Sequence, residues 1–202
     1  MQSQIKEIIE YSIKKGIETQ HREEAAKLYA EEFSKKFEKL LGTPEEVTEI
    51  LKDCINFNYA FTAISSKNEL LGLVGFYHKR SSLMDVKLKK LIKKYGFLSG
   101  LYKKIVISIL FFKKRDNNKQ LLMDGIVVKL KGKGIGTALI RKLVEFAKEN
   151  NMNSIKLDVI DYNPAKRLYN REGFIKTNHI KNLKIVKYYI GVGGLTTMVK
   201  KL

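Results

Sequence analysis

The sequence is poor in the residues that build disulfide-linked and metal-centred folds. Its 202 residues include a single cysteine, Cys54, which excludes an internal disulfide framework and a cysteine-based zinc site. The three histidines, His21, His78 and His179, are widely separated, so metal chemistry has little support. We therefore expect no metal, and a fold stabilised by its apolar residues, which make up 44% of the chain.

Long apolar runs are also missing. Residues 1–10 are polar and charged, without the apolar stretch of a signal peptide. The longest run of apolar character, residues 105–112, is far shorter than the roughly 20 residues that a membrane-spanning helix needs. We interpret this run as a buried helix or an interfacial patch. We expect a cytoplasmic protein with no transmembrane segment.

Acidic residues are outnumbered. There are 21 aspartates and glutamates against 39 lysines and arginines, which gives a net charge of +18. Such an excess favours acidic partners, namely a nucleic acid, an anionic membrane or a polyphosphate ligand. The lysines are spread along the whole chain, however, which fits a genome bias toward lysine codons equally well.

The order of apolar patterns predicts a mixed fold of helices and strands, of α+β or α/β class. We predict one domain over residues 1–202, with a basic helical insertion at 81–119 that contains two amphipathic helices broken near Gly96 and Gly100. The other predicted helices cover 23–41, 44–55, 137–150 and 163–173, and the predicted strands cover 10–17, 59–65, 70–78, 121–128, 154–160, 174–180 and 196–202.

A glycine-rich segment, Lys-Gly-Lys-Gly-Ile-Gly-Thr at 131–137, lies between a predicted strand and a predicted helix. Glycine lets backbone amides approach an anion closely, and the start of a helix presents unpaired N–H groups and a positive dipole end. Lys131 and Lys133 add positive charge. The segment therefore predicts a diphosphate-binding loop.

The loop does not match two common phosphate-binding patterns. The Walker pattern of nucleotide-binding proteins is absent, and the dinucleotide fingerprint would need glycine where Thr137 stands. An ordinary glycine-rich turn between a strand and a helix is the remaining alternative on this motif alone.

The wider context resembles a known family. The run from Leu121 through Val128 to the glycine-rich loop is similar to the coenzyme A-binding motif of the GCN5-related N-acetyltransferases (GNAT). That family's signature, Gln/Arg-x-x-Gly-x-Gly/Ala, falls on Lys131, Gly134 and Gly136. Lys131 keeps the charge of the usual arginine but loses any bidentate contact. Residues 161–174 resemble the family's next motif, Asn-x-x-Ala-x-x-Leu-Tyr-x-x-x-Gly-Phe, with one residue fewer between its Asn and Ala.

The resemblance implies a mixed, mostly antiparallel sheet in which acetyl-CoA lies between two splayed parallel strands, 121–128 and 154–160. It implies transfer of the acetyl group to a primary amine by direct attack, with Tyr169 as general acid. A phenol with a reference pKa of about 10 can protonate a departing thiolate. A tyrosine that simply packs in a helix is the alternative. The cofactor contacts implied are Ile126, Val127, Val128, Lys131, Lys133, Gly134, Ile135, Gly136, Thr137, Asn163 and Tyr169.

The attacking amine must be neutral, so a base or a water chain must take its proton. Asp124 is the first candidate, because strand alternation places it on the same side as Ile126 and Val128. A structural acid is the alternative, and Glu69 and His78 are weaker candidates for the base.

Acceptor contacts are expected from the first two helices and from the insertion. Phe33, Lys36 and Phe37 are candidate wall residues, although their helical spacing is also typical of a core. The insertion is expected to be a lid, a homodimer surface, an anionic-membrane contact or a solvated helix pair. The acceptor itself is expected to be a small-molecule or peptide amine. The alternative function is a non-catalytic module that binds acyl-CoA or nucleic acid, although no aromatic-interleaved RNA motif is visible.

Overall fold

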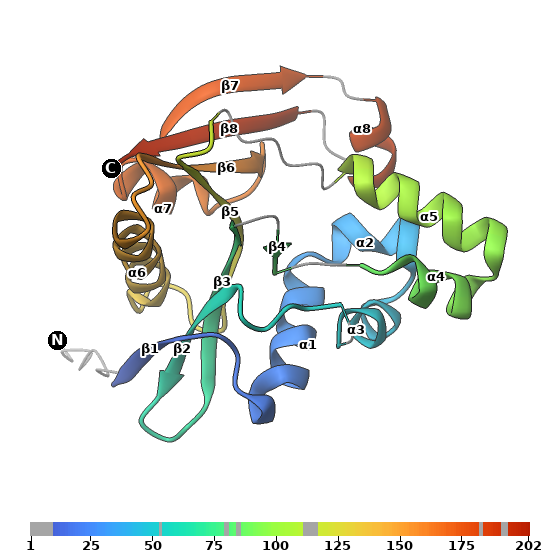
Figure 1. The fold of residues 1–202 in the computed structure, drawn as a ribbon, viewed down its shortest axis with the longest axis horizontal. Coiled ribbons are helices and arrows are strands. Elements are labelled where there is room, and N and C mark those ends of the chain that lie inside the picture. The colour runs from blue at the N-terminus through green and yellow to red at the C-terminus, as the bar shows by residue number, and fades with distance from the viewer. Residues whose placement is uncertain are drawn as a thin grey trace, which may run out of the picture.

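The computed structural model (Figure 1) describes residues 10–52, 54–78, 81–83, 86–110, 117–181, 184–190 and 194–202. Its helices are α1 (Arg22–Glu32), α2 (Ser34–Leu41), α3 (Pro44–Lys52), α4 (Leu88–Tyr95), α5 (Phe97–Leu110), α6 (Ile135–Glu149), α7 (Lys166–Arg171) and α8 (Lys184–Ile190). Its strands are β1 (Tyr11–Lys15), β2 (Ala60–Ser65), β3 (Leu70–His78), β4 (Ser81–Ser82), β5 (Gln120–Val128), β6 (Ser154–Ile160), β7 (Ile175–Lys181) and β8 (Gly194–Lys201).

The strands form one mixed sheet in the order β1-β2-β3-β5-β6-β8-β7, and β4 pairs with β3. Only β5 and β6 run parallel among the pairs of the described strands. Their pairing ends at Leu122 and Lys156, after which β5 continues beside β3 and β6 continues beside β8. The two strands therefore diverge in the middle of the sheet, as the family resemblance implied.

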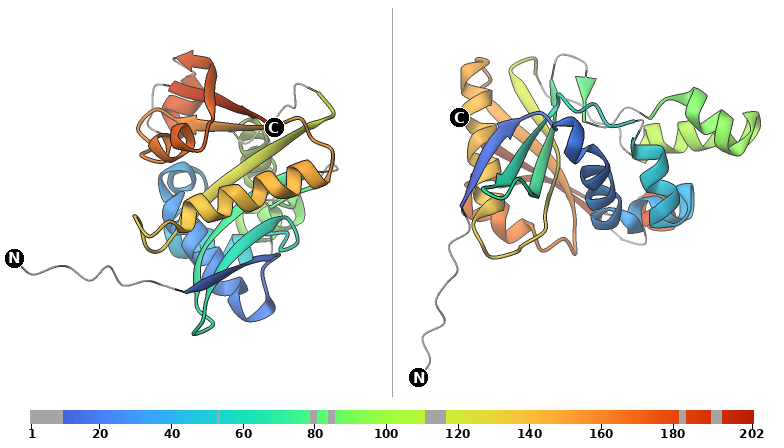
Figure 2. Two further views of the ribbon diagram at one scale, coloured as in Figure 1. Left: turned by 90° about the vertical axis from the view of Figure 1, so that its left-hand side faces the viewer. Right: turned by 90° about the horizontal axis from the view of Figure 1, so that it is seen from below.

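Each face of the sheet has its own apolar cluster. Helix α6 contributes Leu139 and Leu143 to the cluster on one face. Helices α1 to α5 contribute to the other cluster, with Ala26 and Leu51 fully buried. Figure 2 shows α6 on one side of the sheet and α1 on the other. The divergence of β5 and β6 is thus held open between two packed layers.

Strand β5 carries an irregularity at Asp124 that corrects one prediction. Gly75 pairs with Gly125 whereas Phe76 pairs with Met123, so Asp124 is an extra residue in β5. Ile126 belongs to the α6-side cluster. Asp124 instead lies on the other side of the sheet. A Cβ added to Gly75 would lie 3.2 Å from the Cβ of Asp124, and it would also touch Leu83 of the α1-side cluster. The bulge interrupts the alternation, and Asp124 faces α1 rather than sharing a side with Ile126 and Val128.

Three further elements differ from expectation. The helix predicted over 23–41 is two helices, α1 and α2, with a break at Phe33. The ring of Phe33 lies against Gly125. A Cβ added to Gly125 would be 2.8 Å from this ring. The short strand β4 precedes the two predicted insertion helices, and α8 occupies a segment for which no element was predicted. The apolar spacing continues across the break at Phe33, so periodicity does not show it.

The insertion forms a helical hairpin. Gly96, with φ of +80°, separates α4 from α5, which confirms one of the two predicted break points. Gly100 lies inside α5, where a Cβ would be 2.6 Å from the backbone nitrogen of Ile92, so the missing side chain allows the two helices to touch. Figure 2 shows the pair projecting from the side of the sheet. Among the described helices, none is long and apolar enough to cross a membrane.

Candidate active site

A cleft of about 490 Å³ opens where β5 and β6 diverge. It is lined by the end of β5, the loop into α6, the start of α6 and the segment that leads into α7. Nine predicted residues line it, namely Ile126, Val127, Val128, Lys131, Gly134, Ile135, Gly136, Thr137 and Asn163. Two motifs that are remote in the sequence therefore meet at one opening.

The loop end of the cleft has the features of an anion site. Gly132 and Gly134 have φ of +76° and +79°, a region that favours glycine. Gly134 is the N-cap of α6, and its carbonyl accepts from the N–H of Ala138. The N–H groups of the first three helical residues have no partner within the helix. Lys131, Arg167 and Arg171 add positive charge to the lining, while Lys133 is exposed on the same loop and is not among the lining residues.

The open edge of β5 can bind an extended ligand. The N–H of Lys129 donates to the carbonyl of Leu71 in β3. Since backbone groups alternate along a strand, those of Ile126 and Val128 point away from β3 and toward the gap left by β6. A ligand with amide groups, lying between the strands, would pair with them.

Tyr169 lies on α7 next to Leu168, which lines the cleft, but Tyr169 itself is not among the lining residues. Its side chain is buried, and it packs with Phe174 at 5.9 Å between ring centroids. Burial, followed by the charge of Glu32, raises the pKa of Tyr169 well above its ordinary value. The phenol is protonated at neutral pH and can donate a proton, and its raised pKa makes it a weaker acid than an exposed tyrosine.

A second buried tyrosine and the bulge carboxylate lie nearby. Burial raises the pKa of Tyr29, with further contributions from Asp124 and Tyr169. The hydroxyl of Tyr29 is 3.4 Å from the position of a Cβ on Gly125, and its ring lies 4.4 Å from that of Phe33. Side chains from α1, β5 and α7 therefore converge at the bulge.

A profile described as the Acetyltransferase (GNAT) family matches residues 22–174. The chain belongs to this family. GNAT members are acetyltransferases that use acetyl-CoA, so the protein is an acyltransferase and the cleft is where its cofactor is expected.

Solved structures of acetyltransferases share the GNAT fold. A GCN5-related N-acetyltransferase from Kribbella flavida is 12% identical with a TM-score of 0.59, and the match covers 95% of this chain and 98% of that chain. A variant of agmatine N-acetyltransferase is 14% identical with a TM-score of 0.59, and the match covers 96% of this chain and 100% of that chain. A search of curated proteins found no match to the sequence. At these identities the likeness shows the fold alone.

The residues of this GNAT chain fit acetyl-CoA. The diphosphate fits the amides at the start of α6 and the cations of the lining, and the pantetheine fits the free edge of β5. Asn163 also lines the cleft, and its side-chain oxygen accepts from the N–H of Ala165 at 2.8 Å. That hydrogen bond shapes the turn before α7, whose N-cap is Ala165.

Glu32 is a site residue that sequence reasoning missed. It is exposed at the end of α1, lines the cleft and lies close enough to raise the pKa of Tyr169. Among the residues that line the cleft in the described part of the chain, it is the single acid. The break at Phe33 ends α1 at this point, and the sequence pattern did not reveal that break.

The other candidate residues lie elsewhere. Glu69 is exposed in the turn between β2 and β3, and His78 is buried with its ring 5.7 Å from that of Phe146. Phe33 is buried against the bulge, and the side chains of Lys36 and Phe37 fall outside the described residues. Of the expected acceptor walls, Phe33 is thus the one that the structure brings to the site.

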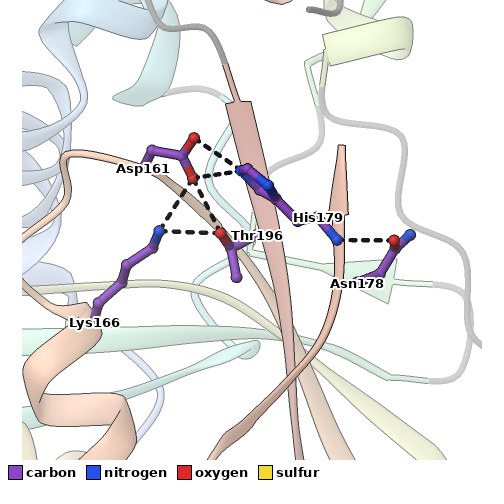
Figure 3. Close-up of polar contacts among 5 residues, drawn as sticks. All are labelled: Asp161, Lys166, Asn178, His179 and Thr196. Carbon is purple, nitrogen blue, oxygen red and sulfur yellow. Dashed lines mark hydrogen bonds and ion pairs between the residues drawn. The ribbon is translucent and has the colours of Figure 1, made fainter. Parts of the chain in front are cut away.

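A polar cluster behind α7 was also missed (Figure 3). Asp161 accepts from His179 Nε2 at 3.0 Å, from Lys166 at 3.1 Å and from Thr196 at 3.0 Å. These hydrogen bonds, that of His179 foremost, lower the pKa of Asp161 to about 2. The cluster joins β6, β7, β8 and α7, and so fixes the segment that carries Asn163.

Proposed function

We propose that the protein transfers the acetyl group of acetyl-CoA to a primary amine by direct attack, as one domain over residues 1–202. The observation that supports this proposal is the cleft itself, whose loop end has the features of a diphosphate site and whose α7 side is lined by Leu168, the neighbour of the buried Tyr169. Bound acetyl-CoA supplies a thioester carbonyl and a thiolate leaving group. Tyr169 donates a proton to that thiolate as its bond to carbon breaks.

The amine must be held and deprotonated on the side of α1. After burial, the charge of Asp124 contributes to the raised pKa of Tyr29, and the charge of Glu32 contributes to the raised pKa of Tyr169. We assign Glu32 to attracting the ammonium form of the acceptor and Asp124 to accepting its proton. As the carbon–nitrogen bond forms and the carbon–sulfur bond breaks, Asp124 holds one proton of the ammonium and the thiol holds the proton of Tyr169. The second proton that the nitrogen loses returns to Tyr169.

The test is the release of free thiol from acetyl-CoA with a panel of primary amines. Tyr169→Phe is expected to reduce turnover about a hundredfold or more, the range of general acid catalysis. Coenzyme A affinity, measured by calorimetry, should change little because the hydroxyl alone is removed. Tyr162→Phe is the matched control, since Tyr162 is exposed and lies outside the lining of the cleft.

The results separate the parts of the proposal. Full turnover by Tyr169→Phe would remove the general-acid role. Coenzyme A binding with no thiol release for any amine would favour a non-catalytic acyl-CoA-binding module. Absence of coenzyme A binding would contradict the whole assignment of the cleft.

A further inference from the structure

Helix α5 exposes a continuous apolar row. Half of the ten exposed large apolar side chains in the described residues lie on this one helix. They are Phe97, Leu98, Leu101, Tyr102 and Ile105, and Leu98 is 80% exposed. Spacings of three and four residues place them along one face. Single exposed apolar residues are ordinary, whereas a contiguous patch indicates an interaction surface.

The surroundings of this row are basic. Residues 86–110 contain seven lysines and no acidic residue, so they account for seven of the net +18 charges of the chain. Lys87, Lys89 and Lys93 are exposed at the start of α4 and along it. Lys184 and Lys187 are exposed on α8, and α8 touches α5 through the hydroxyls of Tyr189 and Tyr102. Lysines therefore flank the apolar row on two sides.

Contacts with the rest of the protein hold the α4–α5 hairpin so that the apolar row faces outward. Tyr95 donates to the carbonyl of Leu41 at 2.5 Å, Lys104 donates to that of Val86 at 2.5 Å, and Lys103 donates to that of Leu40. Val106 and Ile107 are buried in the α1-side cluster. The inner side of α5 is thus attached, and the face that carries Leu98 and Ile105 stays exposed.

We propose that the α4–α5 hairpin docks on the surface of an anionic lipid bilayer. The apolar row would enter the boundary between headgroups and acyl chains, and the lysines would contact the anionic headgroups. Phe97 and Tyr102 belong to the row and Tyr188 is exposed on α8, and aromatic side chains favour this boundary. A second copy of the chain fits less well, because two basic hairpins would meet face to face and repel. This proposal is independent of the proposed function.

The test measures binding of the full chain to vesicles by sedimentation. One set contains phosphatidylcholine alone, and the other contains phosphatidylcholine mixed with phosphatidylglycerol. The protein is expected to bind the anionic set and to be released by added salt. Leu98→Ser should lower the affinity for anionic vesicles roughly tenfold. The double variant Lys89→Gln with Lys93→Gln should lower this affinity about fivefold for each lysine that is replaced. Ile175→Ser and Lys176→Gln are the controls, since both residues are exposed on β7, Ile175 by 71%.

Equal binding to both vesicle sets, or no binding to either, would overturn the proposal. It would also fail if Ile175→Ser weakened binding as much as Leu98→Ser does. A dimer in solution that Leu98→Ser dissociates would show that a second copy covers the row instead. Because all five substituted side chains are exposed, the thermal midpoint of each variant is expected to match that of the wild type, which excludes loss of fold as a cause.

Discussion

The carboxylate of Glu32, which lines the cleft, acts electrostatically on the buried phenol of Tyr169. Tyr169 is buried and Glu32 is exposed, yet the charge of Glu32 contributes to the raised pKa of the phenol. Most of the charged lining is cationic and suits the diphosphate. The Glu32 carboxylate suits a protonated amine acceptor, because the other charged groups of the lining, Lys131, Arg167 and Arg171, would repel an ammonium group.

Replacement of Glu32 by glutamine should affect the acceptor more than the cofactor. We expect Glu32→Gln to raise KM for the amine roughly tenfold, through loss of a charge contact in a partly exposed site, and to leave KM for acetyl-CoA near its original value. Steady-state kinetics with each substrate varied in turn measures both constants. Glu31→Gln is the matched control, because Glu31 is exposed next to Glu32 but is absent from the lining. Equal effects of the two variants on the amine KM would contradict the assignment.

The connection between β5 and α6 is the element on which cofactor binding depends. Gly134 has φ of +79° and begins the helix, and a Cβ there would meet little, with the Tyr11 hydroxyl 3.9 Å away. A side chain at this position would therefore act through the backbone conformation rather than through a clash. Gly96, between α4 and α5, has φ of +80° and open space around it.

These two glycines allow a matched comparison. Gly134→Ala should lower the free energy of unfolding by about 1 kcal/mol, the usual cost of a left-handed conformation for alanine, and Gly96→Ala, with ψ of 170°, should lower it by at least as much. Gly134→Ala alone should weaken coenzyme A binding, because it disturbs the amides at the start of α6. Denaturant unfolding and calorimetry measure the two effects. A similar loss of affinity in both variants would mean that the loop is not the diphosphate site.

The whole molecule depends on contacts that tie its C-terminal strands to α7. Asp161 joins β6 to β7 through His179, to β8 through Thr196 and to α7 through Lys166 (Figure 3). Its lowered pKa, about 2 against an ordinary value near 3.8, means that the ionised form is favoured in the folded state. Stability from this carboxylate is therefore fully present above its unfolded pKa and is lost as the pH falls through its folded pKa.

Acid titration of stability tests this cluster. Between about pH 4 and pH 2 the free energy of unfolding should fall in the wild type, and Asp161→Asn should show a smaller fall over the same range together with lower stability at neutral pH. Urea unfolding at a series of pH values gives both quantities. Asp158→Asn is the control, since Asp158 accepts from Thr197 on the same pair of strands and leaves Asp161 intact. An unchanged acid profile in Asp161→Asn would show that the cluster adds no pH-dependent stability.

Local patterns in the sequence predicted most elements of the fold. The alternation along 154–160 and the helical spacing along 137–150 correspond to β6 and α6 within a residue or two. The glycine-rich loop indicated one side of the cleft, because phosphate-binding loops need particular residues at fixed spacing, and the family resemblance of residues 161–174 indicated the other side. These features depend on neighbouring residues along the chain, so a single sequence contains them.

The tertiary structure alone decided the details around the reacting atoms. The bulge turns Asp124 toward α1, the break at Phe33 brings Glu32 to the cleft, and the cluster of Asp161 with His179 joins strands that are distant in sequence. Each of these results from contacts between remote segments, which compete with the local preference of the chain and override it. Periodicity describes which side of one element is apolar, and it contains no information about which remote side chain will meet that side.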